Sequence, residues 1–224
     1  ERKRHGVRPA IAQIDTLAAE YPAETNFLYF TYAQTKSDIQ PAGRPSVLIL
    51  GSGCYRIGSS VEFDWCAVSA ARTVRELGYE TILLNCNPET VSTDYDLCDR
   101  LVFDEISVET VLDLYEIENP VGVFISMGGQ TPNTIAMKLF RAGVKIIGTP
   151  PDSIDNAENR KRFSELLDSL EIAQPAWGEA AESANIEAVV EGLGGYPVLI
   201  RPSYVLSGSS MRVAYHPEEL RQFL

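Results

Sequence analysis

Short apolar runs and amphipathic segments alternate between residues 46 and 150. The apolar runs predict buried strands at 47–50, 81–84, 101–103, 121–125 and 144–147. Segments with helical spacing between them predict helices from 59 or 60 to 77, at 108–117 and at 131–141. Ser59 or Ser60 can cap the first helix, and Gly78 is placed to end it. The alternation predicts a mostly parallel sheet with helices on both faces, in a Rossmann-like α/β arrangement.

The pattern differs on either side of this region. Before it, residues 11–19 have the spacing of a short helix, 27–32 is an apolar run typical of a strand, and the Pro- and Gly-rich stretch 40–45 predicts a linker. After it, we expect helices at 153–157, 160–170, 186–193 and from 217, and strands at 196–201 and 211–215. The change near residue 150 predicts a second domain of α+β type.

Composition excludes several classes of protein. Lys and Arg total 19 against 31 Asp and Glu, and the net charge of −12 argues against a nucleic-acid or anionic membrane surface. No apolar run approaches the roughly 20 residues of a membrane span. The four cysteines form no C-x-x-C pair and there are two histidines, so a zinc cluster has little support. The apolar surroundings of Cys66 and Cys86 predict that both pack as small hydrophobic side chains.

Three polar or glycine-rich segments follow predicted parallel strands, at 51–58, 85–94 and 126–130. All three are expected at the carboxyl edge of the sheet, where such folds bind ligands. The first resembles a nucleotide-binding turn, but Arg56 stands where the dinucleotide pattern needs glycine, and no Gly-Lys-Ser/Thr ending is present. The segments therefore either bring backbone amides to an anion or only shape tight turns between strands and helices.

Two carboxylates belong to these segments. Glu62 lies in the first turn of the predicted helix, where the helix dipole alone would favour it, and Glu89 follows Asn87 and Pro88 in a polar turn that is compatible with simple solvation. If the two side chains converge on one crevice, they can line a polar passage or transfer protons.

A third group lies in the second domain. The apolar strand before Arg201 delivers this side chain to a Ser- and Gly-rich loop, an arrangement that suits a polyphosphate. The alternative is an arginine paired to a carboxylate at a domain edge. Arg160 lies at a helix entry of the same domain and, as a lone basic residue, would be a solvated side chain.

Taken together, these segments resemble the large subunit, or synthetase region, of carbamoyl-phosphate synthase. The resemblance covers essentially the whole chain and is specific to the second synthetase half, of eukaryotic type. It is carried by residues 51–66, 85–95, 127–130 and 196–208, the last of which resembles the family's ATP-grasp signature. Residues 13–20 resemble the end of the oligomerisation region that precedes the second half in this family.

The resemblance implies an organisation and a chemistry. Residues 1–44 would be the end of the oligomerisation region and a linker, 45–150 a Rossmann-like pre-ATP-grasp domain, and 151–224 the truncated beginning of an ATP-grasp domain. The family's second half uses ATP and Mg²⁺ to phosphorylate carbamate to carbamoyl phosphate. The metal ligands are expected beyond Leu224, so this piece alone is expected to be inactive.

The resemblance also assigns residue roles. Arg160 and Arg201 match arginines that hold the nucleotide phosphates, and Gly208 matches the loop that closes over them. Glu62 and Glu89 match carboxylates that line the passage by which carbamate arrives. Ser210 departs from the alanine or glycine that is usual in the signature.

Partners and surroundings are implied in the same way. The resemblance implies the remaining synthetase parts and a glutamine amidotransferase domain or subunit as partners, with oligomerisation through the parent protein. The acidic net charge argues against nucleic-acid or membrane partners. It implies a cytoplasmic protein of pyrimidine biosynthesis or, alternatively, a mitochondrial one of arginine or urea synthesis.

Two other classes of function remain open from the sequence. A nicotinamide-dinucleotide oxidoreductase would use the Rossmann-like sheet, but it predicts an acidic residue where Asn85 and Asn87 stand. A scaffolding or regulatory module would use neither the arginines nor the carboxylates for chemistry.

Overall fold

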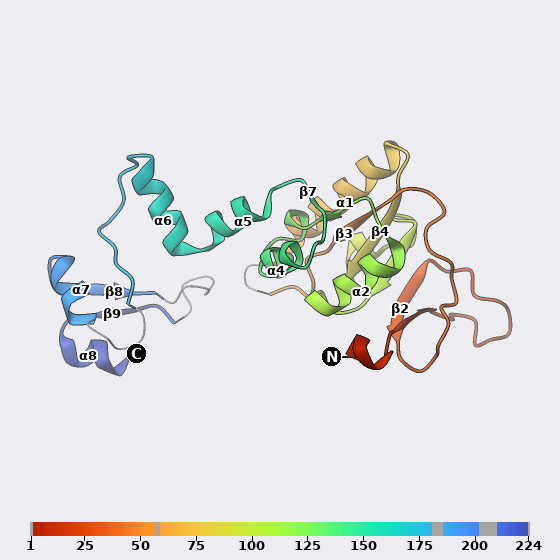
Figure 1. Cartoon of the computed structure of the whole chain (residues 1–224), viewed down its shortest axis with the longest axis horizontal. Helices are drawn as coiled ribbons and strands as arrows, with labels where there is room; N and C mark the ends of the chain where they lie inside the picture. The colour runs from red at the N-terminus through yellow and green to blue at the C-terminus, as the bar shows by residue number, and fades with distance from the viewer. Residues whose placement is uncertain (1, 57–58, 181–185, 202–209, 224) are drawn as a thin grey trace. The chain divides into compact units, whose positions relative to one another are not determined.

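The chain forms two compact units, Glu1–Ile154 and Asp155–Leu224, in a computed structural model that describes residues 2–56, 59–180, 186–201 and 210–223 (Figure 1). The first unit contains a seven-stranded sheet and the second a small two-stranded sheet. The predicted α/β class, with a mostly parallel sheet followed by a smaller mixed domain, is confirmed.

The large sheet has the strand order β1-β2-β5-β4-β3-β6-β7. Every neighbouring pair is parallel except β1 and β2, which are antiparallel. The order from β5 to β7 is that of a doubly wound sheet, whose direction of winding reverses at β3. The strands are β1 (Ala10–Gln13), β2 (Phe27–Thr31), β3 (Ser46–Leu50), β4 (Glu80–Asn85), β5 (Arg100–Phe103), β6 (Val123–Phe124) and β7 (Ile146–Ile147).

Helices connect the parallel strands and cover both faces of the sheet (Figure 1). Ser107 caps α2 by accepting the N–H of Thr110, and Asn119 ends it in the left-handed conformation. Ser60 precedes α1, and Gly78, at a φ of 85°, follows its last turn. The helices of this unit are α1 (Val61–Glu76), α2 (Val108–Glu118), α3 (Gln130–Asn133) and α4 (Ala136–Arg141), with 3-10 helices η1 (Arg2–His5), η2 (Val91–Thr93) and η3 (Ser126–Gly128).

The hydrophobic core has two layers because successive side chains of β3 point to opposite faces. Val47 and Ile49 pack in the layer that contains the apolar residues of α1. Leu48 and Leu50 pack in the layer that contains the apolar residues of α2 and α4. Burial on both faces explains why this strand is an unbroken apolar run in the sequence.

Three local expectations were wrong. Residues 11–19 contain no helix: Ala10–Gln13 is β1, because its backbone groups pair with those of β2. The single helix expected at 131–141 is instead α3 and α4, separated by a turn at Thr134 and Ile135. Cys66 is exposed, since the buried stripe of α1 passes through Ala67 and leaves its neighbour outside.

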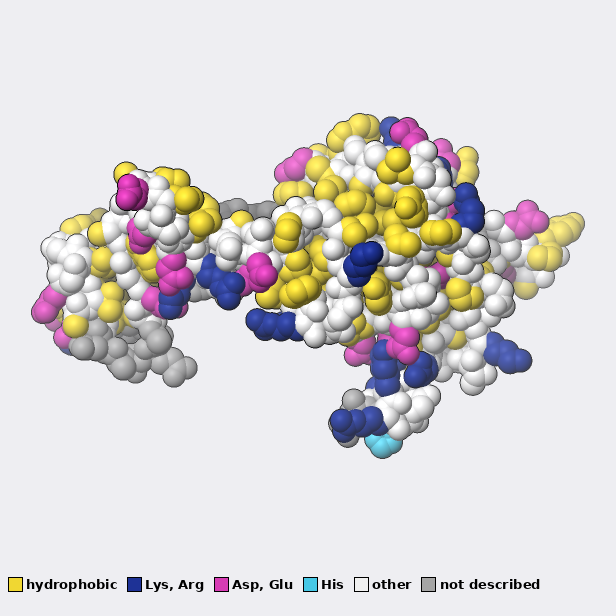
Figure 2. Space-filling view, turned by 45° about the horizontal axis from the view of Figure 1, so that its top comes forward, with side chains coloured by type: hydrophobic (Ala, Val, Ile, Leu, Met, Phe, Trp, Pro, Cys, Tyr) yellow, Lys and Arg dark blue, Asp and Glu magenta, His cyan; other side chains and the backbone are white. Residues whose placement is uncertain are grey.

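The N-terminal segment is held to α2 by charge. Arg2 lies 2.6 Å from Asp113 and 3.0 Å from Glu109, and Lys3 and Arg8 both bind Glu116. In Figure 2, dark-blue basic and magenta acidic side chains lie next to one another on the lower part of this unit.

The second unit is smaller and less deeply packed. Strands β8 and β9 form an antiparallel pair, and the buried cluster consists of Val190, Ala214 and Leu220 with partly buried neighbours. Its elements are α6 (Arg160–Ser169), α7 (Ile186–Gly192), β8 (Val198–Ile200), β9 (Arg212–Ala214) and α8 (Pro217–Gln222), while α5 (Pro151–Glu158) spans the boundary between the units.

Candidate functional site

Asn85, the last residue of β4, organises the carboxyl edge of the large sheet. Its side chain is fully buried, and its Oδ1 accepts the N–H of Gly53 at 3.0 Å and that of Asn87 at 3.4 Å. Its Nδ2 donates to Ser92 Oγ at 3.2 Å. One amide therefore joins the loop after β3 to the loop after β4.

The loops after β3 and β6 also pack tightly against each other. A Cβ at Gly128 would lie 2.2 Å from the carbonyl oxygen of Gly51 and 2.7 Å from that of Leu50. Gly129, at a φ of 68°, lies against the ring of Phe63, where a Cβ would come within 2.7 Å. Backbone therefore occupies the point between β3 and β6 where a doubly wound sheet usually admits a dinucleotide.

Polar side chains complete this packing. Ser59 Oγ and Thr131 Oγ1 both donate to the carbonyl oxygen of Ser52, at 2.7 and 2.9 Å, and Arg56 donates to Thr131 at 3.2 Å. Arg56 and Ser59 exchange two backbone hydrogen bonds of 2.9 Å. The residue that breaks the dinucleotide pattern is thus hydrogen-bonded to both Ser59 and Thr131.

Glu62 is exposed at the start of α1. The pKa of its carboxyl is lowered by hydrogen bonds from the Ser60 side chain and from its own backbone N–H. These contacts stabilise the first turn of the helix, as the sequence analysis allowed.

Glu89 is also exposed, in the loop after β4. Its backbone N–H donates to Asn87 Oδ1 at 3.0 Å, which shapes the turn. The nearby helix η2 contacts α1, since Ser92 N donates to Asp64 Oδ2 at 3.2 Å. The segments that carry Glu62 and Glu89 therefore meet at this edge, and both carboxylates are open to solvent there.

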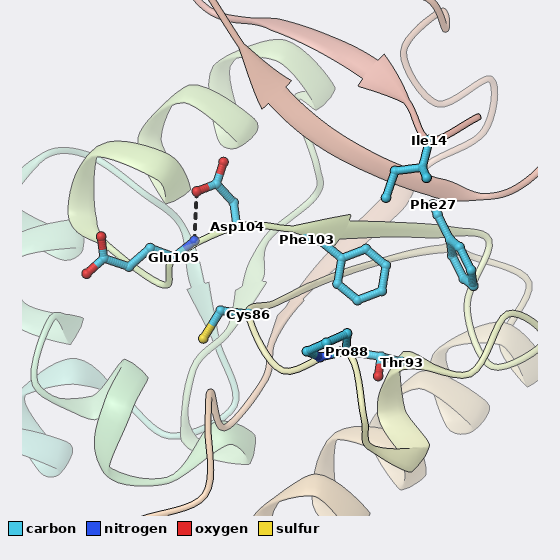
Figure 3. A pocket seen from close by; sticks show the side chains of 8 residues that line it. All are labelled: Ile14, Phe27, Cys86, Pro88, Thr93, Phe103, Asp104 and Glu105. Carbon is cyan, nitrogen blue, oxygen red and sulfur yellow. Dashed lines mark hydrogen bonds between the residues drawn. The ribbon is translucent and has the colours of Figure 1, made fainter. Parts of the chain in front are cut away.

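A pocket of about 500 Å³ opens beside these loops (Figure 3). The rings of Phe27 and Phe103 form much of its wall, with Asp104 and Glu105 at one side. Cys86 and Pro88, from the loop after β4, belong to its lining.

In the second unit, Arg160 and Arg201 lie close enough to interact. Arg160 is the first residue of α6, and Arg201 directly follows β8. The pKa of the Arg160 guanidinium is lowered, first by burial and then by the positive charge of Arg201, while Glu158 opposes the shift. Two like charges held together in this way favour an anion that both can bind.

The remaining expectations for this unit concern Gly208 and metal binding. Gly208 lies outside the described residues. Among those that the structure describes, no three His, Cys, Asp or Glu side chains gather in a way that could hold a metal ion. Nor does any helix in the described ranges combine the length and apolar character needed to cross a membrane.

Two residues that shape the edge of the first unit were not predicted as site residues. Asn85 was noted only as the wrong residue for a ribose contact, and Asp64 was not singled out. Both are polar residues in otherwise buried surroundings, at 0% and 1% exposure. A polar residue at the end of an apolar strand, or on the buried stripe of a helix, was the signal available.

Comparison with known families shows which family the chain belongs to. Residues 43–156 match the carbamoyl phosphate synthase preATP-grasp domain, and residues 159–224 match the carbamoyl-phosphate synthase L chain, ATP binding domain. The chain belongs to the carbamoyl-phosphate synthase family. The resemblance to its large chain is thereby confirmed.

Relatives of this family match the whole chain. It is 55% identical to multifunctional protein CAD of Squalus acanthias and 56% identical to multifunctional protein URA2 of Saccharomyces cerevisiae. It is 52% identical to the arginine-specific large chain of carbamoyl phosphate synthase from Cutaneotrichosporon cutaneum. The chain spans 10% of the first two proteins and 19% of the third, so it corresponds to one region of much longer enzymes.

Solved structures outside the carbamoyl-phosphate synthase family share the fold. The biotin carboxylase domain of Hydrogenobacter thermophilus 2-oxoglutarate carboxylase, solved with MgADP, ADP and bicarbonate, aligns with a TM-score of 0.55 at 18% identity, over 80% of this chain and 39% of that one. N5-carboxyaminoimidazole ribonucleotide synthetase from Thermus thermophilus aligns with a TM-score of 0.53 at 19% identity, over 79% and 42%.

Proposed function

We propose that this chain is the region of a carbamoyl-phosphate synthase that receives carbamate and begins the ATP site for its phosphorylation, in the second synthetase half. The enzyme would be an ATP-dependent ligase that serves pyrimidine or arginine biosynthesis, as the names of the relatives suggest. The single observation that carries the proposal is the interacting pair Arg160 and Arg201.

The arginine pair is suited to nucleotide phosphates. A guanidinium keeps its charge at any physiological pH and binds phosphate oxygens through two parallel N–H groups. Two of them offset the negative charge that gathers around a transferring phosphoryl group, which is the main task of a protein in this reaction. The pKa of Arg160 is lowered first by burial and then by repulsion from Arg201, and ATP between the two would relieve that repulsion.

Mg²⁺ would accompany ATP in the complete enzyme and shield the phosphate charge. The likeness of this fold to a carboxylase domain solved with MgADP supports that expectation. The part proposed for this chain is to hold the nucleotide phosphates through Arg160 and Arg201. Gly208 is proposed to belong to the loop that covers the phosphates.

Glu62 and Glu89 are proposed to line the route by which carbamate arrives. Both are exposed at the carboxyl edge of the sheet, on segments that meet there. The Glu62 carboxyl also accepts hydrogen bonds from the Ser60 side chain and from its own backbone N–H. Substitution of Glu62 would therefore also destabilise the start of α1.

The competing functions are less well supported. Asn85 is buried and fully used in joining two loops, so it cannot contact a ribose, and the switch point beside Gly128 is filled by backbone. These observations disfavour a dinucleotide-dependent oxidoreductase. A scaffolding module would have no need for two guanidiniums held against their repulsion.

The arginine pair is tested in the full-length parent enzyme. Arg201→Ala is expected to lower carbamate-dependent ATP turnover by ~100-fold or more, because a preorganised charge at the reacting phosphate is lost. Arg162→Ala is the matched control: Arg162 lies on α6 close to Arg160, is exposed and pairs with Asp155 at 2.8 Å, so its loss should leave turnover nearly unchanged. Equal turnover in both variants would support the scaffolding function instead.

The passage is tested by a bulky residue at Glu89. Glu89→Phe is expected to leave bicarbonate-dependent ATP hydrolysis intact while output of carbamoyl phosphate falls, because the intermediate no longer reaches the second site. Glu76→Phe, at the opposite end of α1 and exposed, is the control. Equal loss of both activities in Glu89→Phe would contradict a passage role.

The parent protein is proposed to supply the remaining synthetase parts and a glutamine amidotransferase domain or subunit, and to oligomerise. Multifunctional and large-chain relatives many times longer than this chain support such partners. A cytoplasmic location is proposed, with a mitochondrial one as the alternative, since one relative of 52% identity is a mitochondrial large chain. Localisation of the tagged parent protein distinguishes the two.

A further inference from the structure

Two cysteines from different loops meet at the carboxyl edge of the first unit. Cys54 lies in the loop after β3 and is exposed, and Cys86 lies directly after β4 and is half-buried. The sulfur of Cys86 interacts with both the thiol and the backbone N–H of Cys54. The two residues are 32 positions apart in the sequence, so the fold alone brings them together.

The side-chain amide of Asn85, which joins the two loops, also holds the backbone next to each of the two cysteines. Asn85 Oδ1 accepts from Gly53, the residue before Cys54, and from Asn87, the residue after Cys86. A Cβ at Gly53 would lie 3.6 Å from the sulfur of Cys86, which gives a second measure of how closely the loops approach. The thiols therefore adjoin each other on backbone that is fixed on both sides.

Small molecules can reach both sulfurs. Cys54 is exposed, and Cys86 belongs to the lining of the pocket of about 500 Å³. Figure 3 shows the Cys86 side chain turned away from the rings of Phe27 and Phe103, so its sulfur is not enclosed by the aromatic wall.

We propose that Cys54 and Cys86 form a dithiol site that reacts with low-molecular-weight disulfides such as glutathione disulfide and closes to an intramolecular disulfide. The site is independent of the proposed function, because it uses neither the arginine pair nor the carboxylates. Its closure would join the loop after β3 covalently to the loop after β4.

The chemistry balances in two exchange steps. The Cys54 thiolate, the more exposed of the two, attacks a sulfur of the small disulfide, forms a mixed disulfide and releases one small thiol. The Cys86 thiolate then attacks the Cys54 sulfur and releases the second small thiol. Each protein thiol gives up its proton, two electrons pass to the small disulfide, and no other oxidant is needed. Burial raises the pKa of the Cys86 thiol and so lowers its thiolate fraction, which the closeness of the two cysteines offsets in this intramolecular step.

The other two cysteines provide internal comparisons. Cys66 is exposed on α1, and Cys98 is buried, with its pKa raised to about 12 by that burial. Cys66 is expected to retain a mixed disulfide with glutathione, and Cys98 to stay reduced.

The experiment treats the folded 224-residue chain with glutathione disulfide, blocks remaining thiols with an alkylating agent and maps the tryptic peptides by mass spectrometry. We expect a disulfide-linked pair of peptides, 37–56 with 76–100, that lacks two hydrogen atoms and carries no glutathione. Cys98 also lies in the second peptide, so the link must persist in Cys98→Ser.

Two further variants separate the steps. Cys86→Ser should trap the first step, so that Cys54 retains a stable glutathione group, and Cys54→Ser should abolish the linked peptides. The proposal is overturned if wild-type Cys54 retains glutathione as stably as Cys86→Ser does, or if the linked peptides vanish in Cys98→Ser. The wild-type result stands without any variant, so poor folding of one variant does not remove the test.

Discussion

Gly128 packs so closely against the loop after β3 that a side chain at this position would collide with backbone. A Cβ there would lie 2.2 Å from the backbone oxygen of Gly51 and 2.7 Å from that of Leu50, the last residue of β3. We expect Gly128→Ala to lower the free energy of unfolding by about 1–3 kcal/mol or more, the usual range for overpacking. Urea denaturation of the chain measures the change.

Gly43 provides the matched control for that substitution. A Cβ at Gly43 would meet nothing within 4 Å, and its φ lies outside the left-handed region. Gly43→Ala should therefore leave stability unchanged or raise it by about 0.4–1 kcal/mol through the unfolded chain. Similar midpoints for the two variants would mean that the loops can separate at little cost.

At the same scale, the sequence singled out individual residues but not which of them pair. Glu62, Glu89, Arg160 and Arg201 were singled out because each follows or begins a predicted element. The pairing of Cys54 with Cys86 was not predictable, because it depends on one side-chain amide joining two loops. Contacts of this kind leave no periodic pattern in the chain.

Among the elements, β4, β5 and α2 are joined by a charge cluster centred on Arg100. Its guanidinium lies 2.8 Å from Glu80 and 3.1 Å from Glu118, whose side chain is 1% exposed. Arg100→Met would leave a carboxylate buried without its partner, and we expect a loss of about 3–5 kcal/mol in the free energy of unfolding.

The exposed pair of Arg8 and Glu116 provides the comparison for this cluster. Both side chains are largely in water, and Arg8→Met should cost no more than about 1 kcal/mol. A double-mutant cycle of Arg100→Met with Glu118→Gln, followed by urea denaturation, measures the coupling. Additive effects in that cycle would contradict a specific role for the cluster.

Asp99 lies just before β5, in the connection between β4 and β5, and makes the stability of this connection dependent on pH. Burial alone would raise the pKa of its carboxyl, but hydrogen bonds of 2.8 Å from the N–H and Oγ1 of Thr81, with the charges of Arg75 and Arg44, lower it overall. A carboxyl with a lowered pKa in the folded state stabilises the fold above its unfolded pKa of about 3.9, and that contribution is lost as pH falls through the folded pKa.

The test is the difference in unfolding free energy between wild type and Asp99→Asn across pH. We expect a clear difference near neutral pH that shrinks as the pH falls below about 4, because the wild-type carboxyl then becomes neutral. Asp96→Asn, exposed in the same connection, should give a small difference at every pH. A difference in unfolding free energy between wild type and Asp99→Asn that stays constant down to pH 3 would contradict the lowered pKa of Asp99.

Whole elements were predictable where local signals agreed with the fold. The start of α2 was found within a residue because Ser107 caps it and an apolar stripe follows. The strand β1 was missed because Ile11, Ile14 and Leu17 have helical spacing, while the backbone of 10–13 pairs with a strand 14 residues or more away. Pairing between strands is a tertiary effect that overrides weak local preference.

At the scale of the whole molecule, the two units differ in how much core they contain. The first unit buries two layers of apolar residues against seven strands, whereas the fully buried apolar cluster described for the second consists of Val190, Ala214 and Leu220. In addition, α6 has no buried residue, and its Phe163 and Leu166 are exposed. A cluster of that size is small for a chain of 70 residues to fold around.

We therefore expect residues 1–154, expressed alone, to unfold in one cooperative transition, and residues 155–224 alone to show none. Circular dichroism during urea denaturation measures both, and limited proteolysis of the 224-residue chain should cut the second unit first. A steep transition for 155–224 would contradict the expectation. If residues 155–224 are unstable alone, as we expect, the close approach of the proposed phosphate-binding arginines depends on the rest of the parent enzyme. Nucleotide affinity should therefore be higher in the full-length parent than in the 224-residue chain.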